Sequence, residues 1–168
     1  MLKLIGKLII ALNSNVKKSQ IASGLAWGVL LGMIPAGNFF WIVFFVVSFF
    51  FYHNHWAKIF SMTIIKLVSP LFILWIDLIG WEILHISAFL PFFTAIYNMP
   101  FIPFTKFNNT LVMGGIAAGM VLWLPSFILF MIFIPFYRNY IAPKIRNSKI
   151  VGLLAKTPLL KIIDKYFT

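Results

Sequence analysis

The chain is 168 residues long, 62% hydrophobic and only 10% charged, and it contains no cysteine. A soluble domain carries about 25% charged residues, so this composition excludes an ordinary soluble domain and indicates an integral membrane protein. The length predicts a single membrane domain over 1–168. The missing cysteines exclude disulfides, thiolate metal sites and thiol catalysis.

The net charge of +11 is unevenly distributed, because the lysines and arginines concentrate near the two ends of the chain. This pattern follows the positive-inside rule and argues against a nucleic-acid partner. We therefore expect an integral membrane protein with both termini in the cytoplasm. The basic residues expected to contact anionic lipid headgroups are Lys17, Lys18, Arg138, Lys144 and Arg146.

The first two predicted elements are an interfacial helix and a helical hairpin. Residues 1–14 place apolar side chains on one helix face and lysines on the other, which predicts an amphipathic helix lying on the membrane surface. In the hairpin, 20–52, Gly24, Gly28 and Gly32 recur every four residues and share one face. Such a stripe lets a second helix approach closely.

A polar turn divides this hairpin into two short halves. Pro35, Gly37 and Asn38 interrupt the apolar run, and each half has about 15 residues, or roughly 22 Å of helix. That is less than the hydrocarbon core of about 30 Å, which favours a re-entrant or steeply tilted hairpin. Two short full crossings fit the sequence equally well. The five candidates for helix packing and lipid entry here are Gly24, Gly28, Gly32, Pro35 and Asn38.

The next predicted element is a spanning helix over 59–84, kinked by Pro70 near its middle. Two ionisable residues lie within it away from its ends, Lys66 and Asp77, which are about 16 Å apart along the axis and cannot pair. We expect Lys66 to extend toward the cytoplasmic headgroups. Asp77 should face protein, water or a basic partner such as Lys106. Ionisable residues within a span are candidate functional residues, so Lys66, Pro70 and Asp77 join the lipid-entry candidates.

The rest of the chain is predicted as an outer segment over 85–109, a second span over 110–136, and a basic amphipathic cytoplasmic tail over 138–168. Prolines exclude a long straight helix from the outer segment. Its most polar stretch either caps the following helix or docks a periplasmic partner, and the two roles are compatible. The docking candidates are Lys106, Asn108, Asn109 and Thr110.

The sequence contains none of the motifs expected of an enzyme. It has no Ser-His-Asp arrangement, phosphate-binding loop, dinucleotide-binding turn or paired-carboxylate motif. Three histidines without cysteines do not supply the convergent ligands that a metal site needs. We therefore expect no catalytic residues, no metal and no cofactor.

Two sets of motifs resemble known families. The segment QIASGLAWGVLLGMIP (20–35) resembles the I-A-x-G-x-A-x-G-x-x-x-G-x-x-P core of a bacterial membrane domain of unknown function. The opening MLKLIGKLIIALNSN, TAIYNMP (94–100) and FNNTLVMG (107–114) resemble an uncharacterised family of small inner-membrane proteins from bacteria with an outer membrane. Ser23 stands where other members often have a larger apolar residue.

The resemblance implies a genetic context rather than a reaction. Members of this family are often encoded in a two-gene pair with a much larger envelope protein, which implies a large periplasmic partner. By analogy with bridge-like proteins that carry phospholipid between membranes, the small subunit would be the inner-membrane entry point for lipid. The expected partners are therefore membrane phospholipids and this large envelope protein. A homo-oligomer is also compatible with the sequence.

These observations predict an all-α, polytopic membrane protein. It would have a short helical hairpin, two longer spans and an interfacial helix at each end. The leading hypothesis is a non-enzymatic subunit of an envelope lipid-transport or envelope-biogenesis complex. The alternatives are a small channel or ion-coupled secondary transporter that uses Asp77, and a membrane anchor or assembly factor.

Overall fold

A computed structural model describes residues 16–146, and the side chains of Ile145 and Arg146 are not described. The interfacial helix predicted over 1–14 and most of the basic tail predicted over 138–168 lie outside these residues. The described part consists of helices and short turns with no strand, so the all-helical prediction is confirmed.

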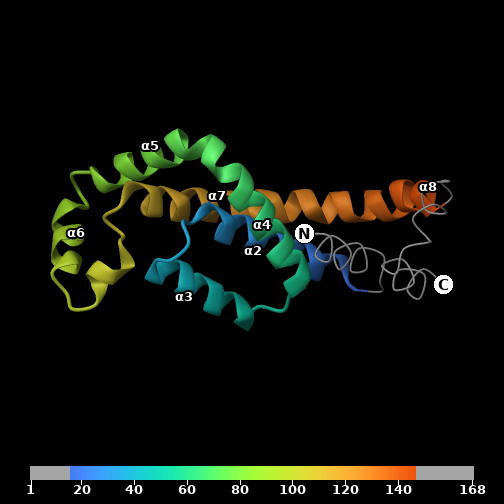
Figure 1. Ribbon diagram of the computed structural model, residues 1–168, viewed down its shortest axis with the longest axis horizontal. Helices are drawn as coiled ribbons and strands as arrows, with labels where there is room; N and C mark the ends of the chain where they lie inside the picture. Colours follow the sequence, from blue (N-terminus) through green and yellow to red (C-terminus); the bar gives the residue numbers. More distant parts are fainter. Residues whose placement is uncertain (1–15, 147–168) are drawn as a thin grey trace.

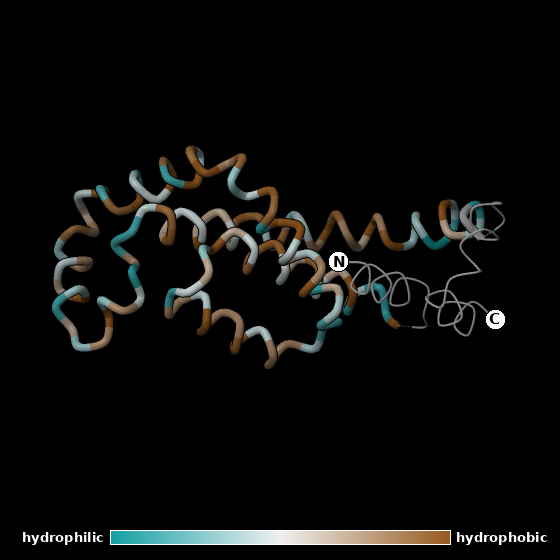
Figure 2. Tube along the Cα trace, viewed as in Figure 1, coloured by the Kyte–Doolittle hydropathy of each residue, from teal (hydrophilic) through white to brown (hydrophobic). Residues whose placement is uncertain are grey.

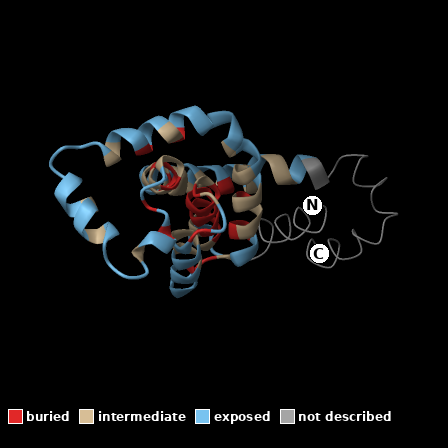
Figure 3. Cartoon of the chain, turned by 60° about the vertical axis from the view of Figure 1, so that its left-hand side comes forward, coloured by how far each residue is buried: buried red, intermediate tan, exposed pale blue. Residues whose placement is uncertain are grey.

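The central element is α2 (Lys18–Met33), which is buried along nearly its whole length. Figure 3 shows the buried residues gathered around this helix, whereas the surrounding helices are mostly exposed. Ile21, Ala22, Ala26 and Leu31 have no exposed surface. Small residues and branched apolar residues alternate here, which suits a helix that neighbours enclose from several sides.

The glycine stripe of α2 faces α4 (His55–Val68). A Cβ at Gly28 would lie 2.5 Å from the Lys58 carbonyl oxygen, and a Cβ at Gly32 would lie 2.5 Å from the Ile65 Cβ. The two backbones approach so closely that only a hydrogen fits between them at these positions. The stripe therefore sets the distance between α2 and α4.

A second long helix, α7 (Thr110–Phe136), packs on another side of α2 and also crosses α5 (Ile73–Leu84). Gly115 lies against the backbone of Met33 in α2. Where α5 and α7 cross, a Cβ on Gly80 or on Gly114 would overlap the backbone of the opposite helix. The predicted span over 110–136 coincides with α7, which continues into a π-helical turn, η4 (Tyr137–Ile141), and α8 (Ala142–Arg146).

The kinked helix predicted over 59–84 begins four residues earlier, at His55, because the Asn54 side chain accepts a hydrogen bond from Ala57 N and caps α4. The polar residues His55 and Lys58, which precede the predicted start of the helix, therefore belong to its first turn. The kink is a 3-10 segment, η2 (Ser69–Phe72), with Pro70 in its first turn. Beyond it, α5 continues to Leu84.

The outer segment contains two short helices, α6 (Leu90–Tyr97) and η3 (Ile102–Thr105). Phe101 and Lys106, which flank η3, both adopt left-handed backbone conformations. Figure 1 places this segment at one end of the molecule, with the basic η4 and α8 at the other. On the side of the α2–α7 pair opposite α5 lies α3 (Phe39–Val47), followed by η1 (Ser48–Phe50).

Two helices of the described chain, His55–Leu84 and Thr110–Lys144, are long and apolar enough to cross a membrane. Only 11% of the most apolar stretch of each is buried within the protein. Figure 2 shows apolar residues along the outer helices. A core helix of a soluble protein would be mostly covered, whereas these two helices present apolar side chains such as Leu74, Val121 and Ile132 to the surroundings.

Candidate functional site

The candidate site lies between α4 and the segment Phe39–Phe50, which we name the α3 arm and which comprises α3 and η1. No residue of α3 is buried. Its outward side chains, such as Ile42 and Val46, are about half exposed and apolar. The arm therefore lies against the helical core without being enclosed by it.

The turn before the arm is built by residues that the sequence had singled out. The Asn38 side chain accepts a hydrogen bond from Trp41 N at 2.8 Å and donates one to the Pro35 carbonyl. Gly37 has a φ of +86°, a left-handed conformation that glycine adopts without steric cost. Trp41 Nε1 then donates to the Leu31 carbonyl at 3.1 Å, which ties the arm to α2.

Lys66 lies beside this turn instead of extending toward the headgroups. Its Nζ donates to the Ile34 carbonyl at 2.9 Å and lies 5.6 Å from the centroid of the Trp41 ring. That carbonyl follows the C-terminal end of α2 and has no helical partner of its own, so it attracts a cation. The prediction that Lys66 extends toward the headgroups is therefore wrong, because the Ile34 carbonyl across the helix interface is a nearer acceptor.

Lys58 holds the other end of the arm and is almost completely buried, with 1% of its surface exposed. Its Nζ donates to Ser48 Oγ at 2.7 Å and lies 3.9 Å from the centroid of Phe49 and 4.9 Å from that of Phe45. The ammonium is thus satisfied by one hydroxyl and two aromatic faces. Sequence reasoning did not include Lys58 among the candidate residues. The signal that it missed is a second lysine two helical turns before Lys66.

Neither ammonium contacts a carboxylate among the residues that the structure describes. The acidic residues in that part of the chain are Asp77 and Glu82, of which Glu82 is exposed. Asp77 Oδ1 accepts a short hydrogen bond from the Thr110 hydroxyl. The site therefore has two cations, an apolar arm in front of them and no anion of its own, which suits a negatively charged ligand group.

Asp77 belongs to a different location, the crossing of α5 and α7. Its hydrogen bond with Thr110 joins the two helices beside the Gly80–Gly114 contact. Asp77 thus faces protein, which was one of the surroundings expected for it, and its partner is Thr110 instead of Lys106. Asn109 caps α7 by accepting from Val112 N at 3.1 Å.

The remaining candidates divide into exposed and packed residues. Lys106 and Asn108 are exposed in the outer segment, and Pro70 lies at the α4–α5 kink. Arg138 Nη2 donates to the Val16 carbonyl at 2.9 Å. Three of the proposed headgroup-contacting residues have exposed side chains: Lys17, Lys18 and Lys144.

A polar residue that the sequence did not single out, His53, lies just before α4. It is 9% exposed, and both of its ring nitrogens lack a hydrogen-bond partner among the described residues. Burial lowers the pKa of His53 to about 4, and the nearby charges of Lys58 and His55 act in the same direction. The imidazole is therefore neutral at pH 7.

The comparisons with known proteins give a relative but no activity. The chain is 29% identical over 161 residues to an uncharacterised protein of Treponema pallidum (strain Nichols), and the match covers 96% of this chain and 99% of that protein. No protein-family model matches the chain. No solved structure matches it either.

Proposed function

We propose that this chain is a non-enzymatic inner-membrane subunit of an envelope lipid-transport or envelope-biogenesis complex, in which it admits phospholipid and docks a large periplasmic partner. One observation carries the proposal. Lys58 and Lys66 point from α4 toward the two ends of an apolar arm and have no carboxylate partner within residues 16–146. A buried cation without a counter-ion is costly, and it is stabilised when a lipid phosphate approaches.

The arrangement suits both parts of a phospholipid. The apolar outer face of the α3 arm is compatible with acyl chains, and the ammonium groups behind it attract the phosphate. Among the described residues, few polar contacts connect the arm to the core: Trp41 donates to the Leu31 carbonyl, Lys58 donates to Ser48, and the Lys66 ammonium lies near the Trp41 ring. Movement of the arm away from α4 would exchange these internal contacts for contacts with a headgroup and open a lateral path for lipid.

The proposal places the chain in the membrane as a polytopic protein. His55–Leu84 and Thr110–Lys144 are the two spans. At 16 residues, α2 is about 24 Å long, and the α3 arm is shorter still, so both are shorter than a hydrocarbon core of about 30 Å. The hairpin is therefore proposed as re-entrant, with both chain termini in the cytoplasm.

The outer segment supplies the proposed docking surface for the periplasmic partner. Asn109 is exposed but uses its side-chain oxygen to cap α7, and Thr110 donates to Asp77, whereas Lys106 and Asn108 are exposed and precede the helix. Docking thus falls to Lys106 and Asn108. The existence of the partner rests on the family resemblance and not on the structure.

The first test compares the wild-type protein with Lys58→Met, both purified from host membranes in mild detergent. Methionine fills a similar volume, and Ser48 keeps its own bond to the Phe45 carbonyl, so the fold should persist with little change in stability. We expect co-purifying phospholipid to fall about tenfold, the equivalent of about 1.4 kcal/mol. Mass spectrometry of lipids and proteins measures the lipid and detects a large envelope partner.

Lys106→Met is the matched control, because it also removes one lysine charge but lies in the exposed outer segment. It should leave bound lipid unchanged and reduce the amount of partner recovered. A wild-type protein that purifies alone, or as a homo-oligomer without enriched lipid, would overturn the proposal. A channel or transporter would then become the leading function.

A further inference from the structure

A cavity of about 470 Å³ opens where the hairpin ends and α4 begins. Its volume lies within the range of about 300–1,000 Å³ that small-molecule sites occupy. Residues from two separate segments line it, since the start of α2 lies beside the turn that enters α4 and Asn54 N donates to the Gln20 carbonyl at 2.9 Å. The lining side chains that matter below are Gln20, Phe49, Phe50, Tyr52, His53 and Trp56.

His53 is the polar group of this cavity that needs a ligand. It belongs to the lining of the cavity and is nine-tenths buried, and both ring nitrogens are covered by protein atoms and have no hydrogen-bond partner among the described residues. Its ring lies between Trp27, at a centroid distance of 6.4 Å, and His55, at 4.7 Å. A neutral imidazole offers one N–H donor and one acceptor, and a buried donor left unpaired is unfavourable.

The electrostatics of the cavity favour an anion. None of the lining residues is acidic. Lys58, one helical turn into α4, has no carboxylate partner within the described chain. The cavity also includes Val16 and Gln20, which flank the N-terminal end of α2, where the helix dipole is positive.

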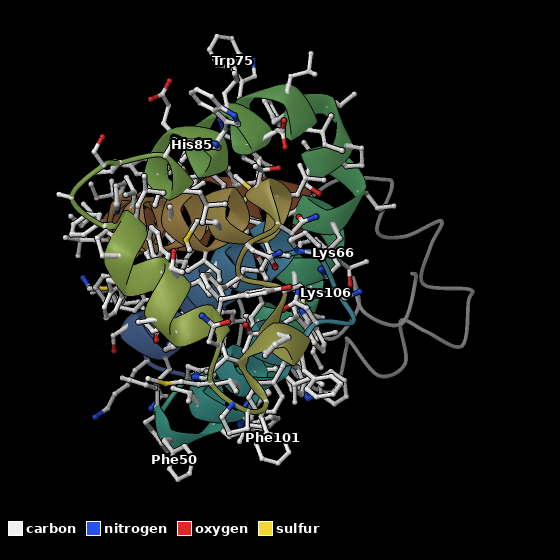
Figure 4. The ribbon with its side chains drawn as sticks, turned by 90° about the vertical axis from the view of Figure 1, so that its left-hand side faces the viewer. Phe50, Lys66, Trp75, His85, Phe101 and Lys106 are labelled. Atoms are coloured by element: carbon white, nitrogen blue, oxygen red, sulfur yellow. The ribbon has the colours of Figure 1, made fainter. Side chains whose placement is uncertain are left out.

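The rim of the cavity is aromatic and faces outward. Phe50 is 85% exposed and Tyr52 86% exposed, and Trp56 is also exposed. Figure 4 shows Phe50 projecting from the edge of the molecule opposite to Trp75. Amphipathic aromatic side chains such as Tyr and Trp prefer the headgroup level of a membrane, and the phenyl rings can cover the glycerol and upper acyl region of a lipid.

We propose that this cavity binds the phosphodiester headgroup of a membrane phospholipid, with the His53 ring turning toward the cavity so that its N–H donates to a phosphate oxygen, and with the aromatic rim covering the glycerol region. The assignment rests on the proposed function and deepens it, because it gives the lipid a defined site on the same side of the hairpin as Lys58. Free phosphate has the same anionic chemistry but cannot use the aromatic rim.

The test is native mass spectrometry of the full chain in phosphate-free, non-ionic detergent, titrated with phosphatidylglycerol. We expect His53→Phe, which keeps the ring but removes both nitrogens, to weaken retention of the lipid about tenfold. Phe50→Ala, at an exposed position, should weaken it several-fold without affecting folding, so it carries the test if His53→Phe does not fold. The matched control is Phe101→Ala, because Phe101 is 79% exposed and is not one of the residues that line the cavity.

Competition with inorganic phosphate and with glycerol phosphate distinguishes the two sources of the anion. Retention of phosphatidylglycerol in the presence of millimolar inorganic phosphate supports the lipid site. If inorganic phosphate displaces phosphatidylglycerol as readily as glycerol phosphate does, or if the protein binds inorganic phosphate but not the lipid, the lipid site is overturned. If the wild type and both cavity variants retain equal amounts of lipid, the cavity assignment fails and the proposed function survives. If the wild type enriches no lipid, both fail.

Discussion

At the scale of single residues, Asp77 separates the proposed lipid-entry function from an ion-coupled transporter. Its carboxylate accepts a hydrogen bond from Thr110 at the crossing of α5 and α7. This contact gives Asp77 a structural role in joining two helices, and the role needs an acceptor oxygen but no negative charge. An ion-coupled transporter would instead need the charge itself.

Asp77→Asn should therefore have little effect. The amide oxygen can accept the same bond from Thr110, so we expect the free energy of unfolding to change by less than about 1 kcal/mol and bound phospholipid to stay constant. Asp77→Leu is the comparison, because it removes the acceptor and should cost about 1–3 kcal/mol. Thermal unfolding in detergent and lipid mass spectrometry measure both effects. Loss of ion-dependent transport in a stable Asp77→Asn protein would favour the transporter instead.

The residue scale also shows where sequence reasoning stopped. The Pro35–Asn38 turn was predictable, because proline and asparagine near a glycine are local signals. The partner of Lys66 was not, because the Ile34 carbonyl lies 32 residues away and becomes available only when α4 packs on α2. His53 and Lys58 were not among the candidates, since their burial depends on the tertiary contacts of α2 and the α3 arm.

At the scale of elements, glycines set the spacing of two interfaces. A Cβ at Gly114 would overlap the Ile76 carbonyl, and one at Gly28 would lie within 2.8 Å of three atoms of α4. At Gly119 the nearest atoms, all from Leu30, would be 3.1–3.3 Å away. The contacts at Gly114 and Gly28 thus leave no room for a methyl group, whereas the space beside Gly119 is only slightly too small for one.

Alanine substitutions should therefore differ in their cost in a fixed order. Gly114→Ala should destabilise most and Gly28→Ala next, each by about 1–3 kcal/mol because backbone atoms must move apart. Gly119→Ala should cost least, since Leu30 can shift by a few tenths of an ångström. Thermal unfolding of the three variants in one detergent gives the order. Helix propensity alone would stabilise all three variants by up to about 1 kcal/mol, so equal gains at the three positions would show that propensity, and not close packing, decides their stability.

The elements were more predictable than their contacts. Continuous apolar runs bounded by polar residues predicted helices, and the prediction that the elements are helical is confirmed for residues 16–146. The start of α4 was misplaced because a histidine and a lysine in the first helical turn resemble a loop, whereas Asn54 is the actual cap. Which glycines face which helix could not be derived, because α7 carries glycines toward both α2 and α5.

At the scale of the whole molecule, the hairpin begins and ends at the same end of α2. Gln20, near the start of α2, binds Asn54, at the entry to α4, through the backbone. The turn that contains Ala36 lies at the opposite end of α2, and the outer segment with Asn108 lies between the ends of α5 and α7. With a re-entrant hairpin and two spans, the ends of the hairpin should be accessible from the cytoplasm and the outer segment from the opposite side. The turn that contains Ala36 should be accessible from neither side.

The chain has no cysteine, so single substitutions report accessibility without background. Tyr52→Cys, Ala36→Cys and Asn108→Cys each introduce a thiol at an exposed position. With a membrane-impermeant maleimide and vesicles of known orientation, we expect Tyr52→Cys to react from the cytoplasmic side and Asn108→Cys from the outer side. Ala36→Cys should react from neither side, because a turn within the bilayer is shielded by protein and lipid.

Detergent provides the control, since all three thiols should react once the membrane is dissolved. Reaction of Ala36→Cys from the outer side would mean that α2 and the α3 arm cross the membrane fully as two short helices. The cavity beside His53 would keep its position at the cytoplasmic interface in that case, because both arrangements return the chain to the same side. Reaction of Tyr52→Cys from the outer side would contradict both arrangements and would move the cavity and Lys58 away from the leaflet from which lipid is proposed to enter.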